Sequence, residues 1–173
     1  MMKQKGFNLI ELLIALAIMG ILMTVAVPSL NEYFDESNQR ASRDSLISAI
    51  NVAKREALTK KKPTYLCPTT DGDKCSNKWE KGYGWLVYVD SNRDDTKDND
   101  EFVPVSLKNG LSVNLEADHM QLEFSPNGLT TATNFTFCSN LTDGYDEKIE
   151  ITRLGRVRFT GTSKTYCAQE STE

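Results

Sequence analysis

The stretch that decides the fold, from Phe7 to Leu30, reads FNLIELLIALAIMGILMTVAVPSL and carries one charge, at Glu11. A helix of about 20 apolar residues crosses the hydrocarbon core of a bilayer, so the stretch predicts a transmembrane segment over residues 7–28. Lys3 and Lys5 precede it, and cations on that side favour a cytoplasmic N-terminus with the rest of the chain across the membrane. A carboxylate in hydrocarbon is costly, so Glu11 requires an explanation of its own.

The remainder of the chain is polar, with charges throughout and only short apolar runs. The sequence has 173 residues and a formal net charge of −4, which would become −6 without the two lysines that precede the apolar stretch. About 140 residues are enough for one domain with its own core. An acidic balance argues against broad nucleic-acid binding, although it leaves room for a local basic patch.

A second helical pattern follows the apolar stretch, from residue 29 to about residue 60. Leu46, Ile50, Ala53 and Ala57 recur at helical spacing, and charged residues occupy the opposite positions. Three lysines and a proline end the pattern, because cations suit a helix C-terminus and proline does not continue a helix. We therefore expect an amphipathic helix with one face packed on a sheet.

Beyond this helix the apolar residues alternate with a period of two. Short segments rich in β-branched and aromatic residues are separated by turn sequences such as KNG, PNG and DGY. The segments read TYLCP, GWLVYVD, EFVPV, LSVNL, QLEF, NFTFC, KIEIT and RVRFT. A long helix followed by many short antiparallel strands predicts an α+β fold.

All four cysteines lie beyond the apolar stretch, and none forms the CxxC pair that is typical of a zinc site. Four cysteines allow three pairings, and an oxidising compartment favours two disulfides. We favour Cys67–Cys75, which closes a short loop, and Cys138–Cys167, which ties down the C-terminal tail.

Three interpretations of the N-terminal stretch compete. A plain signal anchor accounts for its hydrophobicity, and so does a cleaved secretory signal with Thr24–Ala26 as a weak small-residue cleavage site. Neither accounts for Glu11. The third interpretation rests on a short basic leader that is followed by a glycine, a phenylalanine and a glutamate five residues after that glycine. With these features, KGFNLIELLIALAIMGIL resembles the class III signal of type IV pilins and type II secretion pseudopilins.

This resemblance implies that residues 1–6 are a leader peptide. In the family, prepilin peptidase would cut after Gly6 and N-methylate Phe7, and the apolar helix is kept for assembly into a fibre. The cut would create a new amine at Phe7 that is costly to bury unpaired, so Glu11 of the same or a neighbouring subunit would pair with it. In the family, the glutamate pairs with the amine of an adjacent subunit and so sets the axial register of assembly. As in pilins generally, a curved or locally melted helix is expected around residues 20–28.

Within the family the chain is similar to the GspH/FimT-type minor pilins of the FimT and FimU group. WEKGYGWLVYVDSNRDDTKDNDE looks like the central strand and loop of that group, and LEFSPNG, FTFCS and ITRLGRVR look like its later strands in the expected order. The resemblance implies a pilin fold, in which a long N-terminal helix packs on an antiparallel β-sheet domain. Residues 29–173 would be the periplasmic or extracellular globular domain, including the helix over about 29–60.

The function that the resemblance implies is structural. A minor pilin of a type IV pilus primes assembly with other minor pilins and is incorporated at or near the tip, where it serves twitching, adhesion or DNA uptake. The implied partners are prepilin peptidase, other minor pilins and the major pilin. The chain would be held in the inner membrane before it becomes part of an extracellular pilus. The alternative within the family is a GspH-like pseudopilin of type II secretion.

The segment from KIEIT to RVRFT carries a local positive charge. Arg156 and Arg158 would project from the same solvent face, about 7 Å apart by strand rise, with Leu154–Gly155 as the hairpin turn. Arg153 and Lys164 are expected nearby, and such a patch can hold phosphates. In FimT-type proteins of naturally competent bacteria the GRxR motif, here GRVR, is implicated in DNA uptake, which makes a DNA-binding minor pilin for transformation a second hypothesis. FimU-type pilins share the motif and serve in pilus assembly.

Residues 90–101, DSNRDDTKDNDE, carry six acids and two bases. Five of them fall at the ligand positions of a calcium-binding EF-hand, but Asp95 stands where that loop needs glycine, and a strand rather than a helix precedes it. The five residues are Asp90, Asn92, Asp94, Asp98 and Glu101. We therefore expect a solvated hairpin loop and no metal site.

Nothing in the sequence indicates catalysis. The single histidine, His119, has no nucleophile at a recognisable spacing and is expected on a surface turn, and there is no phosphate-binding GxxxxGK. We expect no enzymatic activity, no cofactor and no small-molecule substrate.

Overall fold

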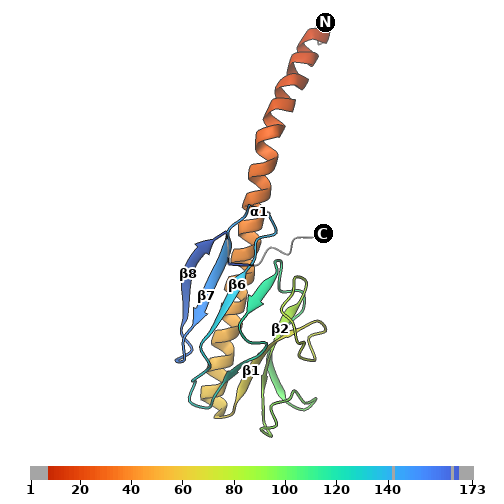
Figure 1. Ribbon diagram of the computed structural model, residues 1–173. Helices are drawn as coiled ribbons and strands as arrows, with labels where there is room; N and C mark the ends of the chain where they lie inside the picture. The colour runs from red at the N-terminus through yellow and green to blue at the C-terminus, as the bar shows by residue number, and fades with distance from the viewer. Residues whose placement is uncertain (1–7, 142, 165, 168–173) are drawn as a thin grey trace, which may run out of the picture. The chain divides into compact units, whose positions relative to one another are not determined.

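The computed structural model of the protein describes residues 8–141, 143–164 and 166–167, without the side chains of residues 24–28. The chain divides into two compact units, one ending at Phe34 and the other beginning at Asp35. This boundary lies inside the long helix, a little later than the expected boundary at residue 28. Within the described residues the elements are one helix followed by eight strands (Figure 1).

The helix α1 runs from Leu9 to Lys60. At its start the Asn8 carbonyl accepts hydrogen bonds from the amides of the first turn. At its end Lys61 takes a left-handed conformation, with φ of 56°. The backbone is helical throughout residues 20–28, so the expected local melting is not found. A proline removes one backbone donor, and the hydrogen bonds of the neighbouring turns are sufficient to keep the segment helical.

One face of α1 in the second unit is buried, as its sequence pattern predicts. Leu46, Ile50, Ala53 and Ala57 have no exposed surface. They join a core cluster with Trp85, Phe124, Phe135, Phe137 and Ile149 from the strands. The apolar stripe of the helix is therefore covered by the sheets, which confirms the α+β arrangement.

The strands form two antiparallel four-stranded sheets. The first has the order β3-β2-β1-β5 and the second the order β4-β6-β7-β8. The strands of the first sheet are β1 (Thr64–Thr69), β2 (Gly84–Val89), β3 (Phe102–Leu107) and β5 (Leu122–Phe124). Those of the second are β4 (Leu115–Ala117), β6 (Thr133–Phe137), β7 (Asp146–Ile151) and β8 (Val157–Ser163).

Seven of the eight expected strand segments overlap their strands closely, and LSVNL does not. In that segment only Leu115 belongs to a strand. Leu111 and Val113 are buried but lie in irregular backbone. The Leu111 amide donates to the Tyr83 carbonyl, in a loop rather than in a strand ladder. In this segment the alternation of apolar residues therefore predicts burial correctly but predicts a strand wrongly.

The strands β1 and β2 are buried on both faces. One face meets the main core, and the other forms a smaller cluster of Tyr65, Cys67, Leu86 and Tyr88. The rings of Tyr65 and Tyr88 stack with their centroids 5.2 Å apart. The Tyr65 hydroxyl donates to Asp95 at 2.5 Å, so the acid-rich loop folds back toward this cluster.

The two disulfides are the pairs favoured from the sequence. Cys67 is bonded to Cys75 across a separation of 8 residues, and Cys138 to Cys167 across 29 residues. The second bond joins the end of β6 to the segment that follows β8.

Candidate assembly surface and basic hairpin

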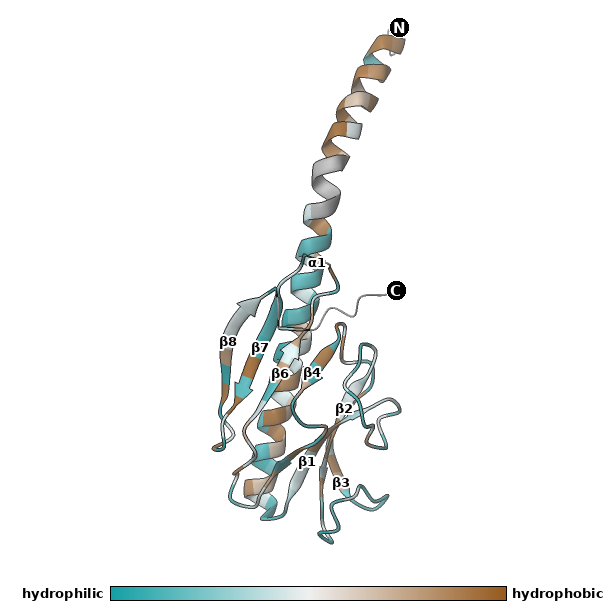
Figure 2. Cartoon of the chain, viewed as in Figure 1, coloured by the Kyte–Doolittle hydropathy of each residue, from teal (hydrophilic) through white to brown (hydrophobic). Residues whose placement is uncertain are grey.

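The first unit exposes a long apolar helical surface (Figure 2). Eleven large apolar side chains between Leu9 and Met23 are each 53% to 75% exposed. They are Leu9, Ile10, Leu12, Leu13, Ile14, Leu16, Ile18, Met19, Ile21, Leu22 and Met23. Their spacing places them on all sides of the helix, a pattern of helices that are buried within a larger apolar environment. We call these residues the apolar helix surface.

Glu11 lies exposed in the first turn of α1, within this surface. The amides of a helix N-terminus favour a carboxylate there. Gly6 and Phe7, the expected processing site, lie outside the described residues. Among the residues that the structure describes, no helix is both long and apolar enough to cross a membrane, so the expected span over residues 7–28 is not confirmed.

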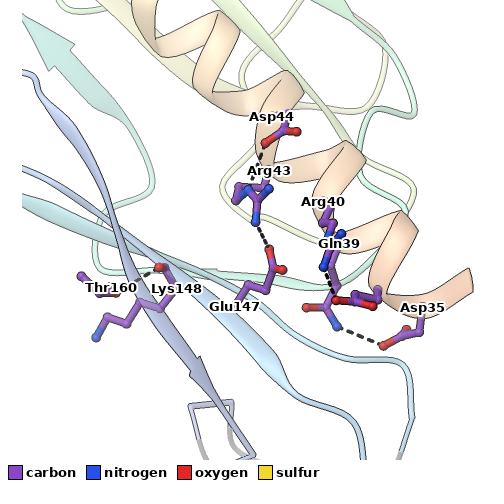
Figure 3. Close-up of polar contacts among 9 residues, drawn as sticks. Asp35, Gln39, Arg40, Arg43, Asp44, Glu147, Lys148 and Thr160 are labelled. Carbon is purple, nitrogen blue, oxygen red and sulfur yellow. Dashed lines mark hydrogen bonds and ion pairs between the residues drawn. The ribbon is translucent and has the colours of Figure 1, made fainter. Parts of the chain in front are cut away.

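A buried carboxylate, Asp35, connects α1 to the loop between β6 and β7. Its Oδ2 accepts hydrogen bonds from Ser139 Oγ at 2.5 Å and from Gln39 Nε2 at 3.0 Å (Figure 3 draws the Gln39 contact). Its Oδ1 accepts two from Asn140, from the amide and the side chain, each at 2.9 Å. Burial alone would raise the pKa of Asp35, but these hydrogen bonds outweigh it and hold the pKa below its ordinary value.

An ion pair lies further along the same side of α1. Arg43 Nη1 donates to Glu147 Oε2 at 2.6 Å, from α1 to β7, and the Glu147 side chain is only 7% exposed (Figure 3). The Arg43 guanidinium also lies over the ring of Phe159, 5.5 Å from its centroid. Burial raises the pKa of Glu147 in spite of the paired arginine. This contact holds the second sheet in place against the helix.

The C-terminal segment is fixed by a second buried acid. One oxygen of Asp146 accepts the Ser139 amide at 2.8 Å, and the other accepts the Cys167 amide at 3.0 Å. The Cys138–Cys167 disulfide makes a covalent connection in the same region. Residues 138–140, β7 and Cys167 therefore form one connected group.

The connection between β7 and β8 is longer than expected. Ile151 pairs with Val157, so residues 152–156 form the loop, where Leu154–Gly155 alone was expected as the turn. The Thr152 amide donates to the Arg156 carbonyl at 3.0 Å, and the Gly155 amide to the Thr152 carbonyl at 2.7 Å. We call residues 152–158 the basic hairpin, because they carry three arginines and no acid.

The arginines of the basic hairpin, Arg153, Arg156 and Arg158, are all exposed. Arg158 faces Glu150 across the β7–β8 ladder. Lys164 is not near them: it lies beyond the other end of β8, about 25 Å from Arg156 along an extended strand. Its ammonium lies over the Tyr145 ring, 5.1 Å from the centroid. The expected patch of four cations is therefore a patch of three.

Gly155 and Lys54 fix the basic hairpin to the core. Lys54 Nζ donates to the Leu154 carbonyl at 2.7 Å. Gly155 has φ of +63°, and a Cβ there would lie 2.9 Å from Phe124 Cε1 and 3.1 Å from Lys54 Cδ. The glycine of GRVR is thus required by backbone conformation and by close packing.

We expect Gly155→Ala to lower the free energy of unfolding by about 2 kcal/mol, because it combines a disfavoured φ with overpacking. The matched control is Gly82→Ala, where φ is +86° and nothing lies within 4 Å of the added Cβ. The control should cost about 1 kcal/mol, measured by denaturant unfolding. Equal losses in the two variants would contradict the packing role of Gly155.

The acid-rich segment, residues 90–101, is a loop held by its own hydrogen bonds. The Asp90 side chain accepts the amides of Arg93 at 2.5 Å and Asp95 at 3.1 Å. Glu101 accepts the amides of Ser91 at 2.7 Å and Asp98 at 3.1 Å. These bonds give Asp90 and Glu101 a structural role within the loop. We call this segment the acidic loop.

The structure also places the single histidine and one cluster of possible metal ligands. His119 is exposed in irregular backbone between β4 and β5. Among the described residues one group has metal-like spacing, formed by Glu116, Cys138 and Cys167, but its two sulfurs are bonded to each other. A disulfide sulfur is not a thiolate ligand.

Comparison with known proteins places the chain in a family. The profile described as "Type II transport protein GspH" matches residues 42–155, and the profile described as "Prokaryotic N-terminal methylation motif" matches residues 1–27. The chain belongs to the GspH family. The methylation motif covers the glycine, phenylalanine and glutamate that the sequence analysis singled out. The GspH match covers α1 from Ser42 onward, strands β1 to β7 and the basic hairpin as far as Gly155.

Curated relatives of this GspH-family chain are pilins. The pilin-like protein PilA1 of Thermus thermophilus is 27% identical over 91% of this chain and 99% of its own length. PilA5 of the same organism, a type IV narrow pilus major component, is 39% identical over 38% of this chain and 56% of its own. The type IV major fimbrial protein FimA of Dichelobacter nodosus is 47% identical over 32% of this chain, and the match spans about a third, 34%, of FimA.

Two solved structures resemble the GspH-family chain. The type IV minor pilin FimU of Pseudomonas aeruginosa is 17% identical, with a TM-score of 0.49 over 75% of this chain and 92% of its own. The minor pseudopilin EpsH of Vibrio cholerae is 12% identical, with a TM-score of 0.48 over 70% of this chain and 95% of its own.

Sequence reasoning missed the residues that hold the site together. Asp35, Asp146 and Lys54 look like ordinary surface charges in the sequence, and each has at least one partner that lies 21 to 105 positions away. The spacing of Asp35 and Gln39 by four helical positions was the one available signal for the buried Asp35.

Proposed function

We propose that this GspH-family chain is a minor pilin of a type IV pilus, which primes assembly and is incorporated at or near the tip. The methylation motif, the family match and the pilin relatives support membership of a pilus. Other minor pilins and the major pilin are the proposed partners. The proposed location is the inner membrane before assembly and the extracellular pilus afterwards, where it serves twitching, adhesion or DNA uptake.

The observation that carries the proposal is the apolar helix surface. Eleven large apolar side chains remain at least half exposed in the first unit. Covering the exposed part of each contributes about 1 kcal/mol, so the whole surface contributes on the order of 10 kcal/mol. Helices of adjacent subunits, packed side by side, would provide that cover on all sides, and this is the proposed assembly step.

Glu11 is proposed to set the axial register of that packing. Prepilin peptidase would cut between Gly6 and Phe7 and methylate the new amine. A cationic amine and a carboxylate buried among apolar helices stabilise each other when they meet, and each is costly when it is unpaired. Subunits that slide out of register would leave both unpaired.

We expect Glu11→Gln to reduce incorporation into sheared pili by at least about tenfold, because an unpaired buried cation costs several kcal/mol. Incorporation is measured as the ratio of pilus-associated to cell-associated protein. Glu32→Gln is the matched control, since Glu32 is an exposed acid of the same helix. If the two variants behave alike, Glu11 has no role in register.

A second candidate function is a DNA receptor for transformation that uses Arg156 and Arg158. The exposure of three arginines with no acid in the basic hairpin favours it. Combining Arg156→Ala with Arg158→Ala in the full chain should then abolish retention of double-stranded DNA and weaken its dependence on salt. Unchanged retention would exclude the receptor.

A third candidate is a pseudopilin of type II secretion, favoured by the description of the matching family. Deleting the gene and measuring both twitching and protein secretion separates the two systems. Loss of twitching with normal secretion supports the pilus, and the reverse supports the secretion system.

A further inference from the structure

Two tight loops of the second unit lie against each other. In the first, residues 125–129, the Ser125 amide donates to the Leu129 carbonyl at 2.8 Å. The second is the basic hairpin, which connects β7 to β8 (Figure 1). The Thr130 amide, next to the first loop, donates to the Arg153 carbonyl of the second at 3.0 Å. The two loops are therefore joined through their backbones.

Both loops are also fixed to the last turns of α1. Lys54 Nζ donates to the Leu154 carbonyl at 2.7 Å. Gly128 has φ of +74°, and a Cβ there would lie 3.0 Å from Leu58 Cδ2. A Cβ at Gly155, where φ is +63°, would lie 3.4 Å from the Gly128 carbonyl oxygen. Left-handed backbone and close packing both favour glycine at these positions, so the single chain already holds the two loops in place.

Each of these three segments leaves a leucine exposed. Leu58 of α1 is 39% exposed, Leu129 of the first loop 48% and Leu154 of the basic hairpin 57%. Leu129 and Leu154 each adjoin one end of the hydrogen bond that joins the loops, and Leu129 follows the glycine that packs on Leu58. We call these three residues the leucine patch. Single exposed leucines are ordinary, but apolar side chains grouped within polar surroundings mark a surface for another molecule.

The leucine patch has a basic rim. Arg153 and Arg156 are exposed on either side of Leu154 in the sequence, and the basic hairpin contains no acid. An apolar centre within a polar rim is the usual composition of a protein interface. A phosphate backbone would pair with the arginines but offers the leucines no apolar partner. The composition therefore favours a protein whose own contact surface is apolar and rimmed with acids.

We propose that the leucine patch and its arginine rim bind a different minor pilin, through an apolar surface of that subunit that carries acids at its edge. This inference rests on the proposed role in priming. Priming brings unlike minor pilins together before a fibre exists, and opposite charges speed the encounter of scarce partners. A subunit at or near the tip makes such a contact once, so the contact does not repeat along the fibre. Arg156 of GRVR then serves subunit contact rather than nucleic acid.

Photo-crosslinking in the native cell tests the contact. Benzoylphenylalanine is placed in the full chain instead of Leu154, and mass spectrometry identifies the crosslinked protein. The matched control carries the same group instead of Met120, which is 55% exposed and precedes β5, whereas Leu129 follows it. The first chain should crosslink to one other minor pilin, and the control should not. No crosslink, a crosslink to the major pilin, or one to the acidic loop of a second copy would overturn the proposal.

A charge-reversed variant tests the rim. Arg153→Glu with Arg156→Glu should lower the crosslink yield at Leu154 by at least about tenfold, because it turns attraction to an acidic edge into repulsion. Lys74→Glu with Lys78→Glu is the control, since it changes the net charge equally at exposed positions on the β1–β2 connection. It should leave the yield unchanged. An equal loss in the two variants would contradict a specific contact.

A leucine variant separates a protein partner from nucleic acid. Leu129→Ser should lower the crosslink yield by about fivefold, because the contact no longer covers one half-exposed leucine. It should leave retention of a double-stranded oligonucleotide unchanged, and Met120→Ser should change neither quantity. If the arginine variant loses oligonucleotide retention while both variants keep the full crosslink yield, the proposal is overturned and nucleic acid is the occupant.

Recovery of the chain from sheared pili distinguishes this inference from the proposed function. If the chain is present in pili and the Leu154 position crosslinks to no minor pilin, the contact is wrong and the pilus role stands. If the chain is absent from pili, the proposed function fails, and the inference that rests on it fails as well.

Discussion

Replacing Cys138 with serine is expected to lower the free energy of unfolding by about 3 to 4 kcal/mol. The Cys138–Cys167 disulfide spans 29 residues, and a crosslink of that length removes chain entropy of this size from the unfolded state. The bond also holds Cys167 where Asp146 binds its amide. Denaturant unfolding of the full chain in non-ionic detergent micelles, followed by tryptophan fluorescence, measures the loss.

The shorter disulfide provides the matched control. Cys67→Ser with Cys75→Ser opens a bridge of 8 residues and should cost less, about 2.5 kcal/mol, because a shorter loop constrains the unfolded chain less. A free thiol that titrates in the native wild-type protein would contradict the pairing. Unchanged unfolding in the Cys138→Ser variant would contradict the stabilising role.

Replacing Asp35 with asparagine is expected to lower the free energy of unfolding by about 3 kcal/mol. The carboxylate accepts four hydrogen bonds from Ser139, Asn140 and Gln39. A neutral amide accepts fewer of them and leaves buried donors without a partner, at about 1 to 3 kcal/mol for the group that is left. Asp44→Asn is the control, because Asp44 is an exposed acid on the same helix and its ion pair with Arg43 contributes about 1 kcal/mol or less.

The Asp35 contribution should also depend on pH. Its pKa in the folded protein lies below the ordinary value of 3.8, so the folded state favours the carboxylate. The stabilisation is therefore complete above pH 3.8 and is lost as the pH falls through the lowered pKa. The difference in unfolding free energy between the wild type and Asp35→Asn should shrink on acidification below pH 3.8. A difference that stayed constant or grew in acid would contradict the assignment.

The main architecture was predictable from local patterns. The helical face of Leu46, Ile50, Ala53 and Ala57 is buried as its spacing indicated, and both disulfides are the pairs favoured among the three possible pairings. These features can be predicted because apolar periodicity and the closure of short loops depend on the positions of residues along the sequence. The basic hairpin was located as well, but Lys164 was wrongly placed beside it, because the sequence does not show how far β8 extends.

What could not be predicted depends on contacts between distant residues. The four-residue spacing between Asp35 and Gln39 does not distinguish the buried Asp35 from its exposed neighbour Glu36, because Glu36 has the same spacing to Arg40. LSVNL alternates like a strand, yet Leu111 bonds to the loop at Tyr83. The acid-rich sequence of residues 90–101 does not show that the Asp90 and Glu101 carboxylates accept backbone amides of their own loop. In each case tertiary hydrogen bonding decides the outcome, and local propensity does not.

The N-terminus of the mature protein, recovered from its native cell, tests the central claim most directly. Mass spectrometry should find a chain that begins at Phe7 and carries one methyl group on its amine, with Glu11 at the fifth position. A chain that retains residues 1–6, or one that begins just after Ala26, would contradict the account of a fibre subunit.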